Sequence, residues 1–219
     1  GLGREDLSAW RNSGLAADAF DDWLTDRVAR RPSGTRALRV YGANGVHEFA
    51  RRALLEALAL APGDHVLDVG CGGGLLLRDV LATGARATGL DHSEEMVSLA
   101  RERAPDAEVV LARAESMPFD DATFTAVAMS VVFFFLSDPL LVLRECHRLL
   151  AAGGRLAIFT TAPELRGTPA APEPNASKGH FHSDQELAEL ARGASFDSVE
   201  VLNDHGGQLL SARVVERPT

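Results

Sequence analysis

This chain has little cysteine, no long apolar run and no excess of basic charge. Only Cys71 and Cys146 occur among its 219 residues, so the sequence encodes no disulfide framework and no CxxC metal site. No apolar run approaches the ~18 residues that a membrane-spanning helix needs. The formal net charge of −9 argues against a nucleic-acid partner, because phosphates require a basic face. No signal-peptide pattern opens the chain, and we expect a cytoplasmic monomer or homodimer with neither a metal nor a membrane partner.

Hydrophobic residues make up 46% of the chain, which is enough for one full core. Between residues 64 and 161 the pattern alternates strand and helix, as is typical of a doubly wound parallel sheet with helices on both faces. Predicted strands lie near 65–69, 86–90, 107–111, 123–130, 155–160, 196–203 and 207–216. Predicted helices lie near 74–83, 93–103, 138–151 and 184–193. Gly153–Gly154 should close the third of these helices, and Ser183 with Glu186 forms a capping box for the fourth.

The flanks of this α/β pattern have a different character. Residues 1–60 should form an N-terminal helical cap, with two short amphipathic helices broken near Ser13–Gly14 and a third from Asn44 to Leu60. Residues 61–219 should form the α/β domain. Within that domain, residues 162–179 are rich in proline and lack periodicity, which predicts a flexible, structureless loop or lid.

The sequence VLDVGCGGG (66–74) joins a predicted strand to a helix through a glycine-rich loop. Glycines at 70, 72 and 74 let the backbone turn tightly and approach a ligand closely. The dinucleotide fingerprint G-x-G-x-x-G fails because Leu75 stands where its third glycine belongs, and the phosphate-binding motif G-x-x-x-x-G-K-[ST] is absent. Asp68, near the end of the strand, would repel a pyrophosphate but suits a ligand that carries an ammonium group.

A second predicted strand ends at Asp91, 21 residues after Gly70 (91 − 70), the usual distance for a carboxylate that binds ribose hydroxyls. From here on, the chain resembles the class I S-adenosylmethionine (SAM)-dependent methyltransferases, in particular those that act on small molecules. The resemblance lies in VLDVGCGGG (66–74), GLDHSEEM (89–96), ARAESMPFDDATFTAV (112–127) and LRECHRLLAAGGRLAI (143–158). These blocks keep the family's order and spacing.

The resemblance implies a doubly wound, seven-stranded, mostly parallel sheet with an antiparallel edge strand, in a three-layer α/β/α arrangement. It also implies SAM as cofactor and S-adenosylhomocysteine (SAH) as product. The implied cofactor-binding residues are Asp68, Gly70, Cys71, Gly72, Asp91, His92, Met96, Ala114, Glu115 and Ser130. Arg113 stands where the family commonly has an aspartate, so the adenine contact should fall to Ala114 or Glu115.

The expected acceptor side also departs from the family pattern. Phe134 and Phe135 stand where many relatives carry histidines, and phenylalanine cannot act as a base. Aromatic faces can instead stabilise a sulfonium and bind an apolar acceptor. His47 and His182 are the candidate catalytic bases, whereas His147 is expected on an exposed helix face. The predicted substrate-binding residues are Tyr41, Phe133, Phe134, His180 and His182.

Three functions are open at this point. The first is SAM-dependent methyl transfer to a small molecule, such as a secondary metabolite, at an oxygen, nitrogen or sulfur atom, with a soft or readily ionised nucleophile favoured. The second is an NAD-dependent oxidoreductase on a doubly wound sheet, which Leu75 and Asp68 disfavour. The third is a SAM-binding protein without transfer activity.

Overall fold

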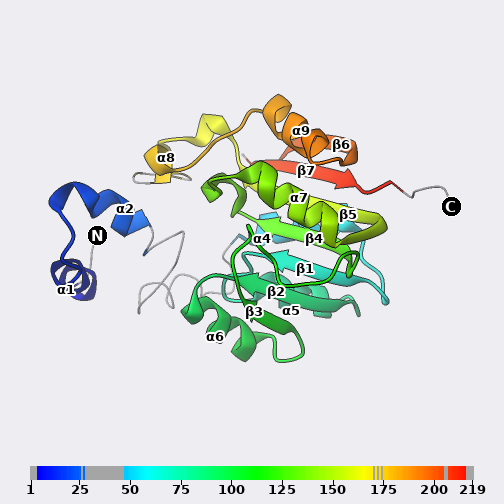
Figure 1. Cartoon of the computed structure of the whole chain (residues 1–219), viewed down its shortest axis with the longest axis horizontal. Helices are drawn as coiled ribbons and strands as arrows, with labels where there is room; N and C mark the ends of the chain where they lie inside the picture. The colour runs from blue at the N-terminus through cyan, green and yellow to red at the C-terminus, as the bar shows by residue number, and fades with distance from the viewer. Residues whose placement is uncertain are drawn as a thin grey trace.

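The computed structural model describes residues 4–25, 27, 47–169, 171, 173, 175–204 and 207–215. Seven strands form one sheet in the order β3-β2-β1-β4-β5-β7-β6 (Figure 1). The strands are β1 His65–Val69, β2 Arg86–Asp91, β3 Glu108–Leu111, β4 Phe124–Ser130, β5 Leu150–Thr161, β6 Asp197–Asp204 and β7 Gly207–Arg213. All neighbours pair in parallel except β7, which runs antiparallel to both β5 and β6. The predicted doubly wound, mostly parallel sheet is confirmed.

Helices cover both faces of the sheet and bury its side chains on each. One face packs against α4 Glu48–Leu58, α5 Leu75–Leu81 and α6 Glu94–Arg103; the other packs against α7 Pro139–Leu149 and α9 Asp184–Gly193. Because both faces of a central strand are covered, its sequence is apolar without alternation. In β1, Val66 packs into the core beneath α4, α5 and α6, whereas Leu67 packs into the core beneath α7 and α9. The capping box of Ser183 and Glu186 forms as predicted at the start of α9.

Chain order creates a crevice beside β1. From β1 the chain adds β2 and then β3 on one side, and it then crosses back to place β4 and β5 on the other. Such a reversal leaves a gap at the carboxyl ends of the strands, because the connections leave in opposite directions. The C-terminal ends of β1 and β4 therefore mark the expected ligand crevice.

One helix boundary differs from the prediction. The helix expected over 138–151 ends at Leu149, and β5 begins at Leu150. Gly153 and Gly154 do not close a helix. The Gly153 N–H donates to the Val214 carbonyl at 2.9 Å, and the Val214 N–H donates to the Gly154 carbonyl at 2.9 Å. Pairing with the chain beyond β7 therefore draws the two glycines into the sheet. Residues 205–206, between β6 and β7, lie outside the described residues.

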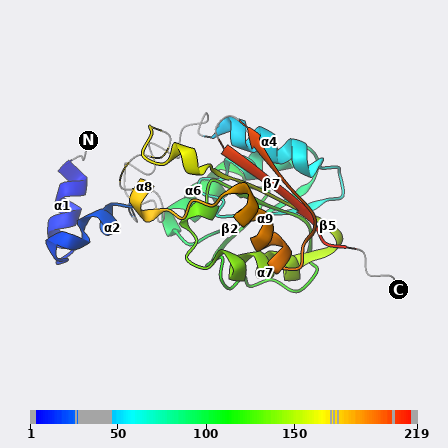
Figure 2. The ribbon, with the colours of Figure 1, turned by 90° about the horizontal axis from the view of Figure 1, so that it is seen from above.

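The N-terminal helices α1 Arg4–Asn12 and α2 Phe20–Thr25 project from the body of the molecule (Figures 1 and 2). The predicted break near Ser13–Gly14 is confirmed, since Gly14 has a φ of 69°. The ring of Trp10 packs on Phe20 at 5.0 Å and on Trp23 at 5.3 Å between centroids. The aromatic side chains of this hairpin thus bury one another.

The third predicted cap helix belongs with the sheet. α4 packs on β5, and its Ala50 and Leu54 are fully buried in the core. α4 thus contacts the sheet closely, and the division of the chain at residue 60 stays a prediction. Residues 44–46, where this helix was expected to start, are outside the described part. None of the helices in that part is long and apolar enough to cross a membrane.

The segment 162–179 is not structureless, although its proline content predicted so. Its described residues include a 3-10 helix, η4 Pro163–Leu165, and a short helix, α8 Asn175–Lys178. The Gly167 N–H donates to Ala171, and the Arg166 guanidinium donates to the Ala176 carbonyl at 2.7 Å. Local pairing of backbone groups gives this segment its shape, which composition could not predict. Its closing over a ligand stays a prediction.

Candidate active site

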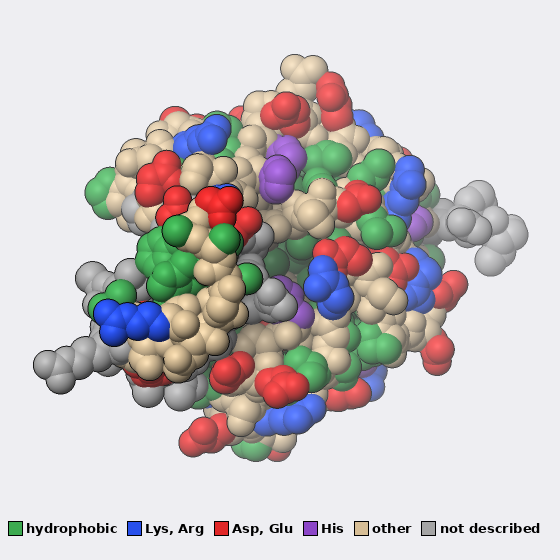
Figure 3. All heavy atoms as spheres, turned by 60° about the vertical axis from the view of Figure 1, so that its left-hand side comes forward, with side chains coloured by type: hydrophobic (Ala, Val, Ile, Leu, Met, Phe, Trp, Pro, Cys, Tyr) green, Lys and Arg blue, Asp and Glu red, His purple; other side chains and the backbone are tan. Residues whose placement is uncertain are grey.

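A cavity of about 470 Å³ opens at the carboxyl ends of β1, β2 and β4, where the crevice was expected. The face shown in Figure 3 is hollowed beside the projecting N-terminal part, with hydrophobic side chains in view inside the hollow. On the same face, Lys and Arg side chains are scattered among acidic ones and form no basic patch. No cluster of three or more potential metal ligands occurs among the described residues.

The glycines of the loop after β1 have two different functions. A Cβ on Gly70 would lie 2.6 Å from Val132, and one on Gly74 would lie 2.9 Å from the backbone of Ala100. The absence of a Cβ at these two positions therefore allows close packing within the protein. Gly72, with a φ of 50°, would instead point a Cβ into open space, with nothing within 4 Å. Gly72 leaves room for a ligand rather than for the protein itself.

Asp68 sits at the floor of the cavity and is only 1% exposed. Its Oδ1 has no hydrogen-bond partner among the described residues. Burial, with the nearby Asp91 carboxylate adding to it, raises the pKa of Asp68 to about 8. A buried carboxyl without a partner costs stability, and a cationic ligand would remove that cost by pairing with it. The site fits an ammonium group at this position.

Asp91 closes the same end of the cavity. Its Oδ2 accepts the Gly72 N–H at 2.9 Å and its Oδ1 accepts the Ser93 N–H at 2.9 Å. Burial raises the pKa of Asp91, although these backbone hydrogen bonds oppose the rise. A carboxylate oxygen has more than one lone pair, so Asp91 can hold the glycine loop and still accept from ligand hydroxyls.

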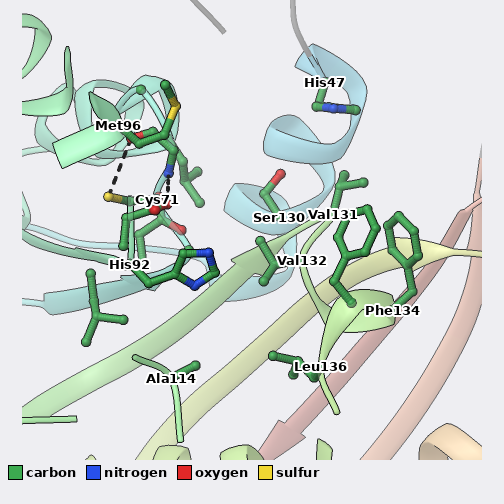
Figure 4. A pocket seen from close by; sticks show the side chains of 18 of the residues that line it. His47, Cys71, His92, Met96, Ala114, Ser130, Val131, Val132, Phe134 and Leu136 are labelled. Atoms are coloured by element: carbon green, nitrogen blue, oxygen red, sulfur yellow. Dashed lines mark hydrogen bonds between the residues drawn. The ribbon is translucent and has the colours of Figure 1, made fainter. Parts of the chain in front are cut away.

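Every predicted cofactor-binding residue lines this cavity. In Figure 4, Cys71, His92 and Met96 lie on one side, with Ala114 below them. Burial raises the pKa of the Cys71 thiol well above its ordinary value, so this cysteine is a packing residue rather than a nucleophile. Arg113, 67% exposed, pairs with Glu115 at 3.2 Å.

The opposite side of the cavity is apolar. It is formed by the chain after β4, from Val131 to Leu136, which includes the 3-10 helix η3 Phe133–Phe135 (Figure 4). Val131 has a φ of 58°, which strains a β-branched residue. Its N–H donates to the Phe159 carbonyl at 2.8 Å, which helps to hold the strained turn. Val131, Val132, Phe134, Phe135 and Leu136 from this stretch line the cavity.

Comparison with known proteins identifies the domain. The family described as "Methyltransferase domain" matches residues 67–158. A demethylmenaquinone methyltransferase of Beutenbergia cavernae is 35% identical over 149 residues, covering 67% of this chain and 59% of the relative. That of Thermotoga maritima is 35% identical over 142 residues, covering 64% of this chain and 61% of the relative. The chain therefore spans about three-fifths of these relatives.

A solved structure agrees with the sequence relatives. A SAM-dependent methyltransferase from Aquifex aeolicus superposes with a TM-score of 0.69 at 25% identity, covering 83% of this chain and 98% of that one. The chain carries a class I SAM-dependent methyltransferase domain. The orphaned Asp68 oxygen and the open space at Gly72 fit its cofactor, SAM, and nothing in the comparisons supports the NAD-dependent alternative.

The predicted acceptor and catalytic residues of this methyltransferase domain are dispersed. His47 and Phe134 line the cavity. Phe133 is fully buried beneath it and contacts the ring of His182 at 5.8 Å between centroids, and neither residue lines the cavity. His180 is exposed and contributes its backbone N–H, which donates to the Phe134 carbonyl at 2.6 Å. Tyr41 lies outside the described residues.

Neither His147 nor His182 lines the cavity. His147 is not on an exposed face as predicted, because its ring packs on Phe196 at 5.2 Å. It is still absent from the cavity lining. The Nε2 of His182 is buried with no partner among the described residues, and burial lowers the pKa of that imidazole.

Sequence reasoning missed several residues that line the methyltransferase cavity, namely Arg51, Val131, Val132, Thr161 and Asn175. Arg51 lies one helical turn after His47, so the i, i+4 spacing of α4 could have found it. Its Nε donates to the Asp79 carboxylate at 2.6 Å, which ties α4 to α5. Thr161 and Asn175 carried no sequence signal, because they reach the site only through the fold.

Proposed function

We propose that this protein transfers the methyl group of SAM to a small-molecule acceptor that is largely apolar and readily ionised. The observation that carries the proposal is the continuity of one cavity from the buried carboxylates of Asp68 and Asp91 to the apolar wall around Phe134. A ligand bound at Asp68 and Asp91 has space beside it, near Phe134, for a second, apolar molecule. The cavity, at about 470 Å³, suits small molecules rather than a macromolecular substrate.

When bound, SAM would supply an activated methyl group on a sulfonium, which leaves as a neutral thioether. The chain's own residues then have to bind, orient and exclude water. Asp68 would hold the ammonium, Asp91 the ribose hydroxyls, and the open space at Gly72 the methionine backbone. The apolar residues after β4 would keep water from the reacting atoms.

Removal of the acceptor's proton falls to His47 or to solvent. His47 lines the cavity, and burial together with the nearby Arg51 cation lowers the pKa of its imidazole. A lowered pKa leaves the ring neutral at pH 7, so it can accept a proton, but it is a weak base. A weak base suffices for a thiol, amine or acidic phenol and not for an unactivated alcohol. This supports a readily ionised acceptor.

The test is product analysis with methyl-labelled SAM and a panel of thiols, amines, phenols and alcohols, with demethylmenaquinone included because two relatives are named for it. We expect label in one acceptor class and a mass gain of one methyl. Titration calorimetry with SAM, SAH and NAD runs in parallel. Tight binding of SAH with no labelled product in any class would favour a SAM-binding protein without transfer activity, and binding of NAD alone would overturn the assignment.

We further propose that the protein works in the cytoplasm as a monomer or homodimer. Both cysteines of the chain are unpaired and buried, as a reducing compartment allows. Light scattering at micromolar concentration decides between the two oligomeric states.

A further inference from the structure

Asn175, at the start of α8, is one of the residues that line the cavity. Its side-chain Oδ1 is buried and has no hydrogen-bond partner among the described residues. Leaving such a group unpaired costs ~1–3 kcal/mol. A carboxamide can turn about its last torsion and offer either an oxygen or an N–H₂ group, so a ligand hydroxyl could pair with it in either role.

The position of Asn175 is fixed by contacts to the apolar wall. The Gly179 N–H donates to the Asn175 carbonyl at 2.8 Å and closes α8. The next N–H along the chain, that of His180, donates to the Phe134 carbonyl at 2.6 Å. A Cβ on Gly179 would lie 2.7 Å from the Phe134 ring, so α8 and η3 are in tight contact. The segment that carries Asn175 is therefore held against Phe134, one of the aromatic residues that would contact the acceptor.

The chemistry beside Asn175 indicates the shape of its partner. The rings of Phe134 and Phe135 pack 4.0 Å apart between centroids with an interplanar angle of 34°. Aromatic walls of this kind bind flat apolar rings well. An acceptor made only of apolar atoms would leave the amide unpaired, whereas one with a single hydroxyl would satisfy it.

We propose that Asn175 is an acceptor-binding residue of this site, and that it selects planar, apolar acceptors that carry a hydroxyl group. The proposal rests on the proposed function, since it names the substrate class of the same cavity. Asn175 acts by binding and orienting the acceptor, and it moves no proton itself.

The test uses the complex of the protein with SAH, so that binding is read without turnover. 2-Naphthol and 2-methylnaphthalene are the probes, because they differ only by a hydroxyl in place of a methyl group. In the unaltered protein we expect 2-naphthol to bind about 10-fold more tightly, the scale of one hydrogen bond to a confined polar group. Asn175→Leu, which keeps the volume but loses the amide, should reduce the preference to about 2-fold or less.

Ser177→Ala supplies the matched control, since Ser177 is an exposed residue of the same short helix. It should keep the full preference for 2-naphthol. SAH affinity and the thermal midpoint report whether each variant is folded, and Asn175→Ala replaces the leucine variant if that one fails to fold.

Equal binding of the two probes to the unaltered complex would overturn the proposal, as would a preference that survives removal of the amide. Binding of neither probe would overturn the planar aromatic class. All three results leave the proposed function standing, provided that SAH binds. Failure of SAH to bind the unaltered protein would instead overturn the proposed function.

Discussion

The two ends of the cavity bind by different physical means. At the cofactor end, the buried carboxyl groups of Asp68 and Asp91 lie beside the glycine loop, whose Gly72 N–H donates to Asp91. At the acceptor end, the chain from Val131 to Leu136 presents apolar surface, with Asn175 and Thr161 as polar exceptions. Charge and backbone geometry suit one invariant ligand, whereas apolar contact tolerates variation in shape. The difference indicates a rigid binding site for SAM and an adaptable binding site for the acceptor.

Filling the space at Gly72 should break the cofactor end most severely. Gly72→Val would place a branched side chain where a ligand must lie, and we expect SAH affinity to fall about 100-fold or more, equal to ~2.7 kcal/mol. The positive φ adds a cost of ~1–2 kcal/mol to folding. Gly14→Val shares both the positive φ and the open surroundings, but Gly14 does not line the cavity. The control should lose the same stability and keep full SAH affinity in calorimetry.

Asp68→Asn should weaken SAM binding and, at pH 8, stabilise the ligand-free protein. Loss of a charge-assisted hydrogen bond predicts a 10- to 100-fold weaker affinity for SAM, about 1.5–3 kcal/mol. The pKa of Asp68 is raised to about 8 in the folded protein. Its proton must therefore leave before the carboxylate pairs with an ammonium, and affinity should rise with pH between 5.5 and 7.5 in the unaltered protein only.

As pH rises, the stability of the ligand-free protein should fall, whereas its affinity for SAM should rise. Because the folded state keeps the Asp68 proton up to about pH 8 while the unfolded state loses it near pH 4, the free energy of unfolding falls as pH rises across that window. Asp68→Asn removes this decline and should be the more stable protein at pH 8 in urea titrations. A variant with the same pH dependence as the unaltered protein would contradict the buried, unpaired state of this carboxyl.

Asp91→Ala tests the second carboxylate. It should weaken SAM binding by ~1.5–3 kcal/mol, because charged hydrogen bonds to the ribose are lost. It also removes the acceptor for the N–H groups of Gly72 and Ser93. We therefore expect faster amide exchange in the glycine loop even without ligand. An unchanged dissociation constant would remove Asp91 from the ribose site.

The smallest effect is expected at the acceptor end. His47→Ala should slow single-turnover transfer only a few-fold, with a pH profile set by the acceptor, because the lowered pKa makes His47 a weak base. A loss of ~10²-fold or more, at the scale of general-base removal, with a rate that follows one histidine-like pKa, would make His47 indispensable. Arg52→Ala, at an exposed ion pair with Glu56 on α4, serves as the neutral comparison.

The same contrast explains what the sequence could predict. The cofactor end comes from the C-terminal ends of β1 and β2 and the loop after β1, so Asp68, Gly72 and Asp91 lie in recognisable sequence blocks and all line the cavity. The acceptor end is assembled from segments remote in sequence, at 47, 131–137, 161 and 175. No local pattern predicts that Asn175 joins it, or that Phe133 turns into the core while Phe134 faces the cavity.

The fold was predictable for a related reason. Strand and helix periods depend on local apolar patterning, and the strands of the sheet appeared within a few residues of their predicted bounds. Errors arose where distant pairing decided the conformation. Gly153–Gly154 joined the sheet through Val214, and the segment 162–179 took its turns from hydrogen bonds that composition does not reveal.

A crystal structure of the protein with SAH tests the division of the cavity most directly. It should show the ammonium against Asp68, the ribose hydroxyls on Asp91 and the backbone of the ligand over Gly72. The thioether should face the chain from Val131 to Leu136, with the space beside Phe134 and Asn175 left for a second molecule. SAH lying across that apolar space, or bound away from Asp68 and Asp91, would contradict the account.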